Sequence, residues 1–340
     1  MTIQRTYRSG RTSSGSTCSP SKTRVAAGLL LAGAAVGLPV LVSEVIRRRA
    51  EAPQAPRWGR AHRFPGALGE IVFQELGTGT PPFLLLHSFG PGYDASQWRA
   101  SAERLAENHS VFVPDLPGWG RSETPAGGHL PELYVRALAG FLDRAIDGPA
   151  MIVAAGLSAA YAVRIALEHP ERVLGLVLVN PIGLRADSAA LGSSGAAFLR
   201  RLLQVPVVRS TTLDLLTSRA SLDHHLRREA YAAPERVDAA LLDHHYRASH
   251  KAHARTALSA LLRGDLWLEV EEGLDQLEVP VLLTWGRTAK AAPVANADLW
   301  LRRLPDAQVE VFPGSADLPH VESSSAFCKA VEAFTGRLRG

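Results

Sequence analysis

One segment, residues 151–162, constrains the fold of this chain more than any other. It reads Met-Ile-Val-Ala-Ala-Gly-Leu-Ser-Ala-Ala-Tyr-Ala, an apolar run that reaches a glycine and continues in residues that favour a helix. The pattern predicts a buried strand that turns sharply into a helix, with Ser158 at the turn. Such a turn is tight, so the residues two positions before and after the serine must be small, and Gly156 and Ala160 meet this requirement.

Short apolar stretches alternate with segments of helical periodicity after residue 70. This alternation predicts an α/β fold, in which helices cover both faces of a mostly parallel sheet. The expected strands are short, apolar and bounded by turn residues, as the buried strands of such sheets are. They span 71–76, 83–86, 111–113, 150–154, 173–179, 279–284 and 309–312.

The amino-terminal part of the chain predicts a membrane anchor. Residues 1–24 are polar and basic, and we expect them to form a disordered tail. Residues 25–46 are mostly apolar and, as a helix, are just long enough to cross the ~30 Å hydrocarbon core of a bilayer. Residues 47–63 begin with three arginines, contain two prolines, and are expected to be a linker. A secretory signal and a soluble helix are the alternative interpretations of 25–46.

Charge is unevenly distributed along the chain. Residues 1–63 hold eleven Lys or Arg and two acidic residues, a net charge of +9; since the whole chain carries +4, residues 64–340 carry −5. An acidic globular part without a basic, aromatic-studded face argues against binding of nucleic acid. The arginines that follow the apolar run favour a cytoplasmic location for the globular part. The expected partner is the membrane, bound through the helix 25–46.

Several further motifs occur in the same order as in a known family. The chain resembles the cap-containing serine hydrolases of the α/β-hydrolase fold family, in which 151–162 corresponds to the nucleophile elbow. The resemblance implies a hydrolase core over 64–182 and 266–338 and an inserted helical cap over 183–265. The other motifs that carry it are Leu84–Gly90, Pro114–Ser122, Glu168–Val173 followed by Asn180-Pro181, and Trp285-Gly286.

The same resemblance assigns site residues and shows two gaps. It implies that Ser158 is in the nucleophile position and that the backbone amides of Phe89 and Ala159 form the oxyanion hole. The position of the family's catalytic histidine holds Asp317. The two positions where members of the family carry the triad acid hold Ala289 and Asn180. The Ser-His-Asp triad is therefore incomplete. We expect the elbow and the loop after the strand 83–86 to keep their structure, because backbone donors do not depend on side-chain identity, and we expect ordinary triad catalysis to be absent.

Two residues are candidate replacements for the missing base. A carboxylate such as Asp317 is a poor base for a serine hydroxyl at neutral pH because its usual pKa is about 4. His320 belongs to a Pro-His-x-Glu pattern in which the histidine is usually structural, and it is the candidate rescue base. The expected function is binding of an apolar or acyl ligand, with impaired or non-standard catalysis. The alternatives are an active serine hydrolase of lipid-like esters that uses Asp317 or His320, and a protein-docking module without a ligand pocket.

Histidines are repeated in the expected cap. Leu-Asp-His-His occurs at 222–225 and again at 242–245. Adjacent histidines on a helix project about 100° apart and do not converge on one metal ion. We therefore expect solvated or partly packed histidines, with no metal site and no cofactor. The oligomeric state is left open.

Overall fold

The computed structural model describes residues 58–188 and 201–338. Eight strands form one sheet in the order β1-β2-β4-β3-β5-β6-β7-β8. β1 pairs antiparallel with β2 and β2 antiparallel with β4, whereas all other neighbours are parallel. The strands are β1 (Arg60–Gly66), β2 (Gly69–Leu76), β3 (Phe83–Leu86), β4 (Val111–Pro114), β5 (Ala150–Ala155), β6 (Val173–Val179), β7 (Val281–Gly286) and β8 (Gln308–Phe312).

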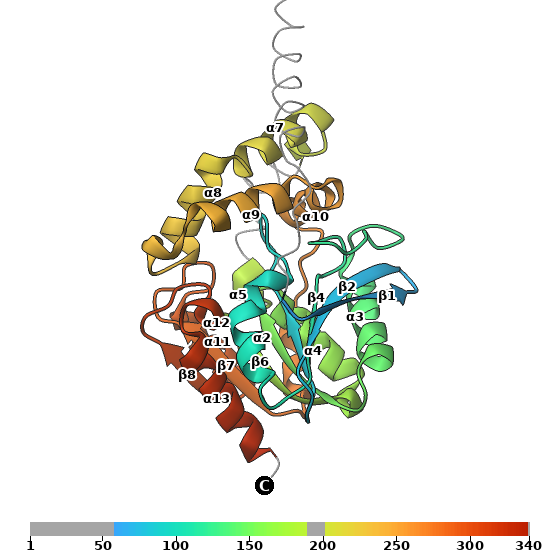
Figure 1. Ribbon diagram of the computed structural model, residues 1–340, viewed down its shortest axis with the longest axis vertical. Helices are drawn as coiled ribbons and strands as arrows, with labels where there is room; N and C mark the ends of the chain where they lie inside the picture. Colours follow the sequence, from blue (N-terminus) through green and yellow to red (C-terminus); the bar gives the residue numbers. More distant parts are fainter. Residues whose placement is uncertain (1–57, 189–200, 339–340) are drawn as a thin grey trace, which may run out of the picture. The chain divides into compact units, whose positions relative to one another are not determined.

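Helices of the core lie on both sides of this sheet (Figure 1). One face packs against a cluster that includes Leu138 and Phe141 of α3 and Ile165 of α4. The opposite face packs against a second cluster that includes Ala102 of α2 and Phe327 of α13. The core helices are α2 (Arg99–Leu105), α3 (Pro131–Ala145), α4 (Ser158–Glu168), α5 (Arg185–Ser188), α11 (Ala297–Arg303), α12 (Pro319–Glu322) and α13 (Ser324–Arg337).

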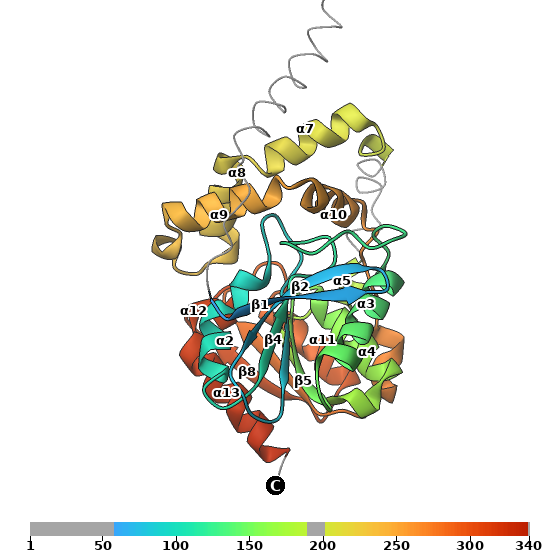
Figure 2. The ribbon, with the colours of Figure 1, turned by 45° about the vertical axis from the view of Figure 1, so that its right-hand side comes forward.

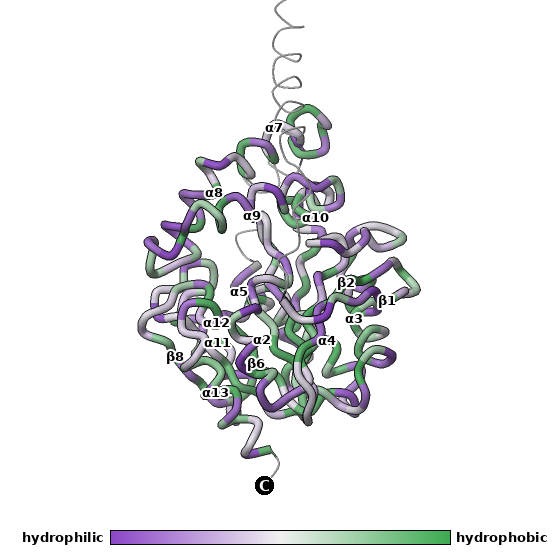
Figure 3. The backbone as a smooth tube through the Cα atoms, viewed as in Figure 1, coloured by the Kyte–Doolittle hydropathy of each residue, from purple (hydrophilic) through white to green (hydrophobic). Residues whose placement is uncertain are grey.

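Burial explains why these strands form at continuous apolar runs. Every residue of β3, β4 and β5 is buried, because helices exclude water from both faces of a parallel sheet. In Figure 3 the tube through the central part of the core is largely green, whereas its outer turns carry more purple. The seven strands expected from the sequence are all present, with ends that differ by at most two residues.

One strand was missed. β1 begins at Arg60, within the segment 47–63 that was expected to be a linker. Its sequence, Arg-Ala-His-Arg-Phe-Pro-Gly, is half exposed and polar, so it lacks the apolar run by which the other strands were recognised. The strand forms because β2 pairs with it along its whole length, from Arg60 opposite Glu75 to Gly66 opposite Gly69.

In the described part of the chain, four α-helices form a cap on one side of the core (Figures 1 and 2). They are α7 (Pro206–Leu216), α8 (Arg219–His225), α9 (Ala239–Ser249) and α10 (Ala252–Arg263), and they fall within the expected cap, 183–265. The expected tail 1–24 and membrane helix 25–46 lie outside the described residues. Within 58–188 and 201–338, none of the helices has both the length and the apolar character needed to span a bilayer.

Candidate functional site

Ser158 stands where β5 passes into α4. The strand ends at Ala155 and the helix begins at Ser158, which confirms the strand-turn-helix predicted for 151–162. Gly156 takes a φ of +58°, and a Cβ at this position would lie 2.2 Å from Ser88 Oγ. Backbone conformation and close approach therefore both require glycine in the turn. Ser158 is 1% exposed.

The hydroxyl of Ser158 is hydrogen-bonded to a carbonyl group. Its Oγ donates to the His87 carbonyl oxygen at 2.5 Å. Among the described residues, no imidazole nitrogen and no carboxylate oxygen forms a hydrogen bond with this hydroxyl. A serine becomes a nucleophile when a neighbouring base removes its proton, and an amide carbonyl is too weak a base to do so.

Asp317 points its carboxylate at the loop that follows β7. Its Oδ1 accepts hydrogen bonds from the backbone N–H groups of Lys290 at 2.7 Å and Ala291 at 3.1 Å. Burial raises the pKa of Asp317, although these two hydrogen bonds act in the opposite direction. Ala289, at one of the two predicted acid positions, lies in the same loop directly before Lys290 and is buried. The carboxylate is thus engaged with the loop in which the family's acid would stand.

Asn180, at the other predicted acid position, joins three segments at the end of β6. Its Nδ2 donates to the carbonyl oxygens of Asp317 at 2.8 Å and Ala316 at 3.3 Å. Its Oδ1 accepts from the Gly286 N–H at 3.0 Å. The residue has a φ of +42°, a conformation that asparagine tolerates better than most residues. All the polar atoms of this side chain are therefore used to hold the backbone.

His320 is a packed core residue. Its ring lies 4.0 Å from the ring of Trp98, centroid to centroid, and also contacts Phe327. Neither ring nitrogen has a hydrogen-bond partner in the part of the chain that the structure describes. Burial lowers the pKa of His320 to about 3, so the ring is neutral at physiological pH. No hydrogen bond connects it with Ser158.

The two predicted oxyanion amides have different environments. The Ala159 N–H donates to the Gly156 carbonyl oxygen at 3.1 Å, a bond that would compete with an incoming oxyanion. The Phe89 N–H has no acceptor among the described residues. The Phe89 ring is held in place by Trp119 and Tyr161, with centroid separations of 5.6 and 5.3 Å. One of the two donors is consequently open and the other is occupied.

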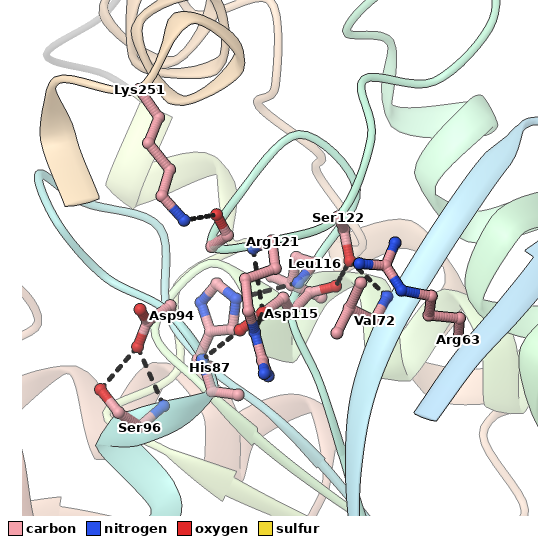
Figure 4. A network of polar contacts seen from close by, with 12 residues as sticks. Arg63, Val72, His87, Asp94, Ser96, Asp115, Leu116, Arg121, Ser122 and Lys251 are labelled. Atoms are coloured by element: carbon pink, nitrogen blue, oxygen red, sulfur yellow. Dashed lines mark hydrogen bonds and ion pairs between the residues drawn. The ribbon is translucent and has the colours of Figure 1, made fainter. Parts of the chain in front are cut away.

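His87 is part of a network of polar contacts that includes Asp115, Leu116 and Arg121 (Figure 4). Its Nε2 accepts from the Leu116 N–H at 3.0 Å, which leaves the proton of the neutral ring on Nδ1, 2.7 Å from the Ser88 carbonyl oxygen. Burial lowers the pKa of His87. In the same network the Asp115 carboxylate accepts from Arg121 Nε at 2.9 Å. Both ring nitrogens of His87 form hydrogen bonds with backbone groups, so the ring stabilises these loops and does not act as a base for Ser158.

A cavity of about 500 Å³ lies between the elbow and the cap. Gly156, Leu157 and Asn180 line it from the core, and residues of α7, α8 and α10 line it from the cap. Both its volume and its mainly apolar lining are typical of small-molecule sites, which measure about 300–1,000 Å³. The apolar lining includes Ile182, Leu216, Leu258, Leu261, Leu262 and Trp267.

The sequence did not indicate a polar group that also lines this cavity. Tyr93 Oη lies 3.2 Å from His225 Nε2, and His225 Nδ1 lies 2.7 Å from Glu229 Oε2. His225 belongs to the first Leu-Asp-His-His repeat, whose histidines were expected to be solvated or partly packed. The available signal was the glutamate four residues after the histidine, a spacing that brings two side chains together on a helix. No group of the described residues has the arrangement needed to hold a metal ion.

Known proteins are similar to most of this chain in sequence and in fold. The family model described as alpha/beta hydrolase fold matches residues 81–324. The chain is similar to a 2-hydroxy-6-oxononadienedioate/2-hydroxy-6-oxononatrienedioate hydrolase of Burkholderia vietnamiensis, with 27% identity over 276 residues, 78% of this chain and 91% of that protein. It is 27% identical over 274 residues to an uncharacterized protein of Mycobacterium tuberculosis, covering 77% of each. A solved serine hydrolase of carbazole degradation has a TM-score of 0.67 at 21% identity, covering 82% of this chain and 98% of that one.

Proposed function

Because the chain belongs to the α/β-hydrolase fold family, we propose that it keeps the family's ligand cavity but has lost ordinary serine-triad catalysis, and that it binds an apolar or acyl ligand under the cap. The observation that carries this proposal is the hydrogen bond from Ser158 Oγ to the His87 carbonyl oxygen, in place of a bond to a base. Asp317 and Asn180, which occupy triad positions, use their side chains to hold backbone groups.

The rate of any hydrolysis at Ser158 depends on removal of its hydroxyl proton. Loss of a serine triad costs about 10⁴ to 10⁶ in rate, and binding together with the oxyanion hole retains about 10³ to 10⁴ over water. Here the hole itself is weakened, because the Ala159 N–H already donates to Gly156. Hydrolysis that depends on Ser158 is therefore expected to be slow, whereas the cavity needs no activated serine to bind a ligand.

Labelling with a fluorophosphonate probe tests the catalytic half of the proposal. The probe reacts with serines whose hydroxyl is activated, so the folded full-length protein is expected to remain unlabelled under conditions that label an active serine hydrolase. Ser158→Ala is the matched control. Rapid labelling that disappears in Ser158→Ala would refute the proposal and favour the alternative, an active ester hydrolase that uses Asp317 or His320 as its base.

Displacement of an apolar fluorophore tests the binding half. N-phenyl-naphthylamine is expected to bind the full-length protein and to be displaced by a medium-chain alkyl compound. Replacing Leu261 with Asp places a charge in the apolar lining and is expected to weaken binding at least tenfold, since burying an unpaired charge is strongly unfavourable. Binding that does not change in this variant would place the fluorophore elsewhere and contradict the proposal.

The proposal also includes a membrane anchor formed by residues 25–46, with the globular part on the cytoplasmic side. The length of this apolar run and the arginines at 47–49 support it. Extraction of membranes with alkaline carbonate provides the test. The full chain is expected to stay in the membrane pellet, and a chain lacking residues 1–46 is expected to be released; release of both would refute the anchor.

A further inference from the structure

The cavity holds a chain of three side chains that comes from two separate parts of the sequence. Tyr93 lies in the loop after β3, 7% exposed, whereas His225 and Glu229 come from the cap. All three line the cavity. Because the core supplies one member and the cap supplies the other two, the arrangement exists only when the cap covers the core.

The hydrogen-bond directions within this chain follow from the donor and acceptor capacities of the groups. A carboxylate only accepts, so Glu229 Oε2 accepts a hydrogen bond from His225 Nδ1–H at 2.7 Å. When the ring carries only this proton, the lone pair on Nε2 accepts a hydrogen bond from the Tyr93 hydroxyl at 3.2 Å. The Tyr93 oxygen keeps lone pairs that face no donor among the described residues. Its place in the wall of the cavity makes this oxygen an acceptor for a bound molecule.

The charges around the Tyr93 oxygen favour a donor over an anion. Asp317 lines the same cavity, and its Oδ1 is bound by two amides, which leaves Oδ2 as a second acceptor with only a long contact, 3.4 Å, to the Ala291 N–H. Burial, followed by the charge of Asp317, raises the pKa of the Tyr93 phenol, so the phenol stays protonated. A carboxylate placed here would face Asp317 and Glu229, both of like charge.

We propose that Tyr93, His225 and Glu229 form a head-group site, and that the ligand of the cavity is an apolar chain ending in a hydroxyl group that donates a hydrogen bond to the Tyr93 oxygen. The apolar lining, which includes Leu258, Leu261 and Trp267, receives the chain of the ligand. This inference rests on the proposed ligand-binding function and adds the chemical class of the ligand. It requires no activated Ser158.

The test compares decanol with decanoate, which share an alkyl chain and differ in the head group. Each displaces N-phenyl-naphthylamine from the full-length protein in detergent, at about pH 8, where histidine is ordinarily neutral. We expect decanol to bind at least tenfold more tightly than decanoate. Tyr93→Phe is expected to weaken decanol binding about tenfold, the effect of one hydrogen bond between neutral groups in a buried site, and to leave decanoate binding unchanged.

Two variants sharpen the test. Tyr246→Phe is the matched control, because Tyr246 is a buried tyrosine of α9 that does not line the cavity, and it should leave both affinities unchanged. Glu229→Gln removes a negative charge from the cavity wall and should strengthen decanoate binding. Equal affinities for decanol and decanoate, with no effect of Tyr93→Phe, would overturn the head-group site while binding under the cap stands. Failure of both compounds to displace the fluorophore would instead refute the proposed function.

Discussion

A largely buried ion pair joins the cap to the core, and its strength is expected to depend on pH. His244 Nε2, in α9, lies 3.0 Å from Asp94 Oδ2, in the loop before Ala95. The side chains are 18% and 13% exposed. Asp94 Oδ1 also accepts from the Ser96 N–H at 2.9 Å and from its hydroxyl at 2.5 Å. Loss of either charge should therefore loosen α9 from the core.

The pKa shifts of the two partners set the pH window. Burial alone would lower the pKa of His244, but the charge and hydrogen bond of Asp94 outweigh it and raise this pKa above its usual value. Burial alone would raise the pKa of Asp94, but His244 and Ser96 outweigh it and lower this pKa well below its usual value. The histidine contribution is complete below about pH 6.5 and is lost as pH rises through the raised pKa. The aspartate contribution is complete above about pH 4 and is lost as pH falls through the lowered pKa.

The magnitude follows from the separation and burial of the pair. Two unit charges about 4 Å apart at an effective dielectric constant of about 20 attract by about 4 kcal/mol, and desolvation reduces this gain. Hydrogen bonds to charged groups contribute about 1.5–3 kcal/mol, and we expect a coupling energy in this range. The expected coupling is largest near pH 5.5 and smaller at higher pH, such as about pH 8.5, since His244 loses its charge as pH rises through its raised pKa.

A double-mutant cycle measures this coupling. His244→Gln, Asp94→Asn and the double variant are unfolded in urea at both pH values, with tryptophan fluorescence as the signal and the full chain held in non-ionic detergent. The control cycle uses His169 and Glu171, an exposed pair with 3.9 Å between Nδ1 and Oε1, for which less than about 1 kcal/mol is expected. A coupling energy for the buried pair that stays constant or grows from pH 5.5 to 8.5 would refute the reasoning.

Two predictions concern the positions at which the family resemblance predicts triad residues. Asn180→Asp is expected to destabilise the protein by about 1–3 kcal/mol, because a carboxylate would face the carbonyl oxygens of Ala316 and Asp317; urea unfolding checks this, and unchanged or increased stability would contradict it. Asp317→His combined with Ala289→Asp supplies a base and an acid, and should raise the hydrolysis of p-nitrophenyl butanoate by about 10²–10⁴. The gain must disappear when Ser158→Ala is added; a gain that persists would assign the hydrolysis to another group.

Local patterns were sufficient to predict the core of the fold. The buried strands are continuous apolar runs, and the elbow requires small residues at fixed positions around Ser158, so both features are evident within short windows of sequence. β1 was missed because edge strands are partly solvated and need no apolar run; its pairing with β2 depends on a partner strand that the pattern of Arg60–Gly66 does not reveal.

For the candidate site, the sequence predicted the positions of several residues but not the contacts that their side chains make. Offsets within the motifs predicted that Asp317, Ala289 and Asn180 stand where the family carries its triad residues, but they did not indicate which groups these side chains bind. The contact between Tyr93 and His225 joins residues 132 positions apart, and only the packing of the cap on the core brings them together. Contacts between a loop and a separate cap helix depend on tertiary structure, for which the periodicity of either segment provides no signal.

Asn180 and Asp317, which stand where the family resemblance leads us to expect triad residues, form hydrogen bonds that stabilise the surrounding loops. Asn180 links the ends of β6 and β7 to residues 316–317, and Asp317 in turn holds the amides of Lys290 and Ala291. One hydrogen-bonded unit thus fixes the three loops that would carry a triad. Replacing Asn180 with an acid or Asp317 with a histidine removes bonds from that unit, so we expect a gain in catalysis at these two positions to reduce stability. Asn180 and Asp317 also line the cavity, so such a replacement changes the polar part of its wall and leaves apolar residues such as Leu258, Leu261 and Trp267 in place.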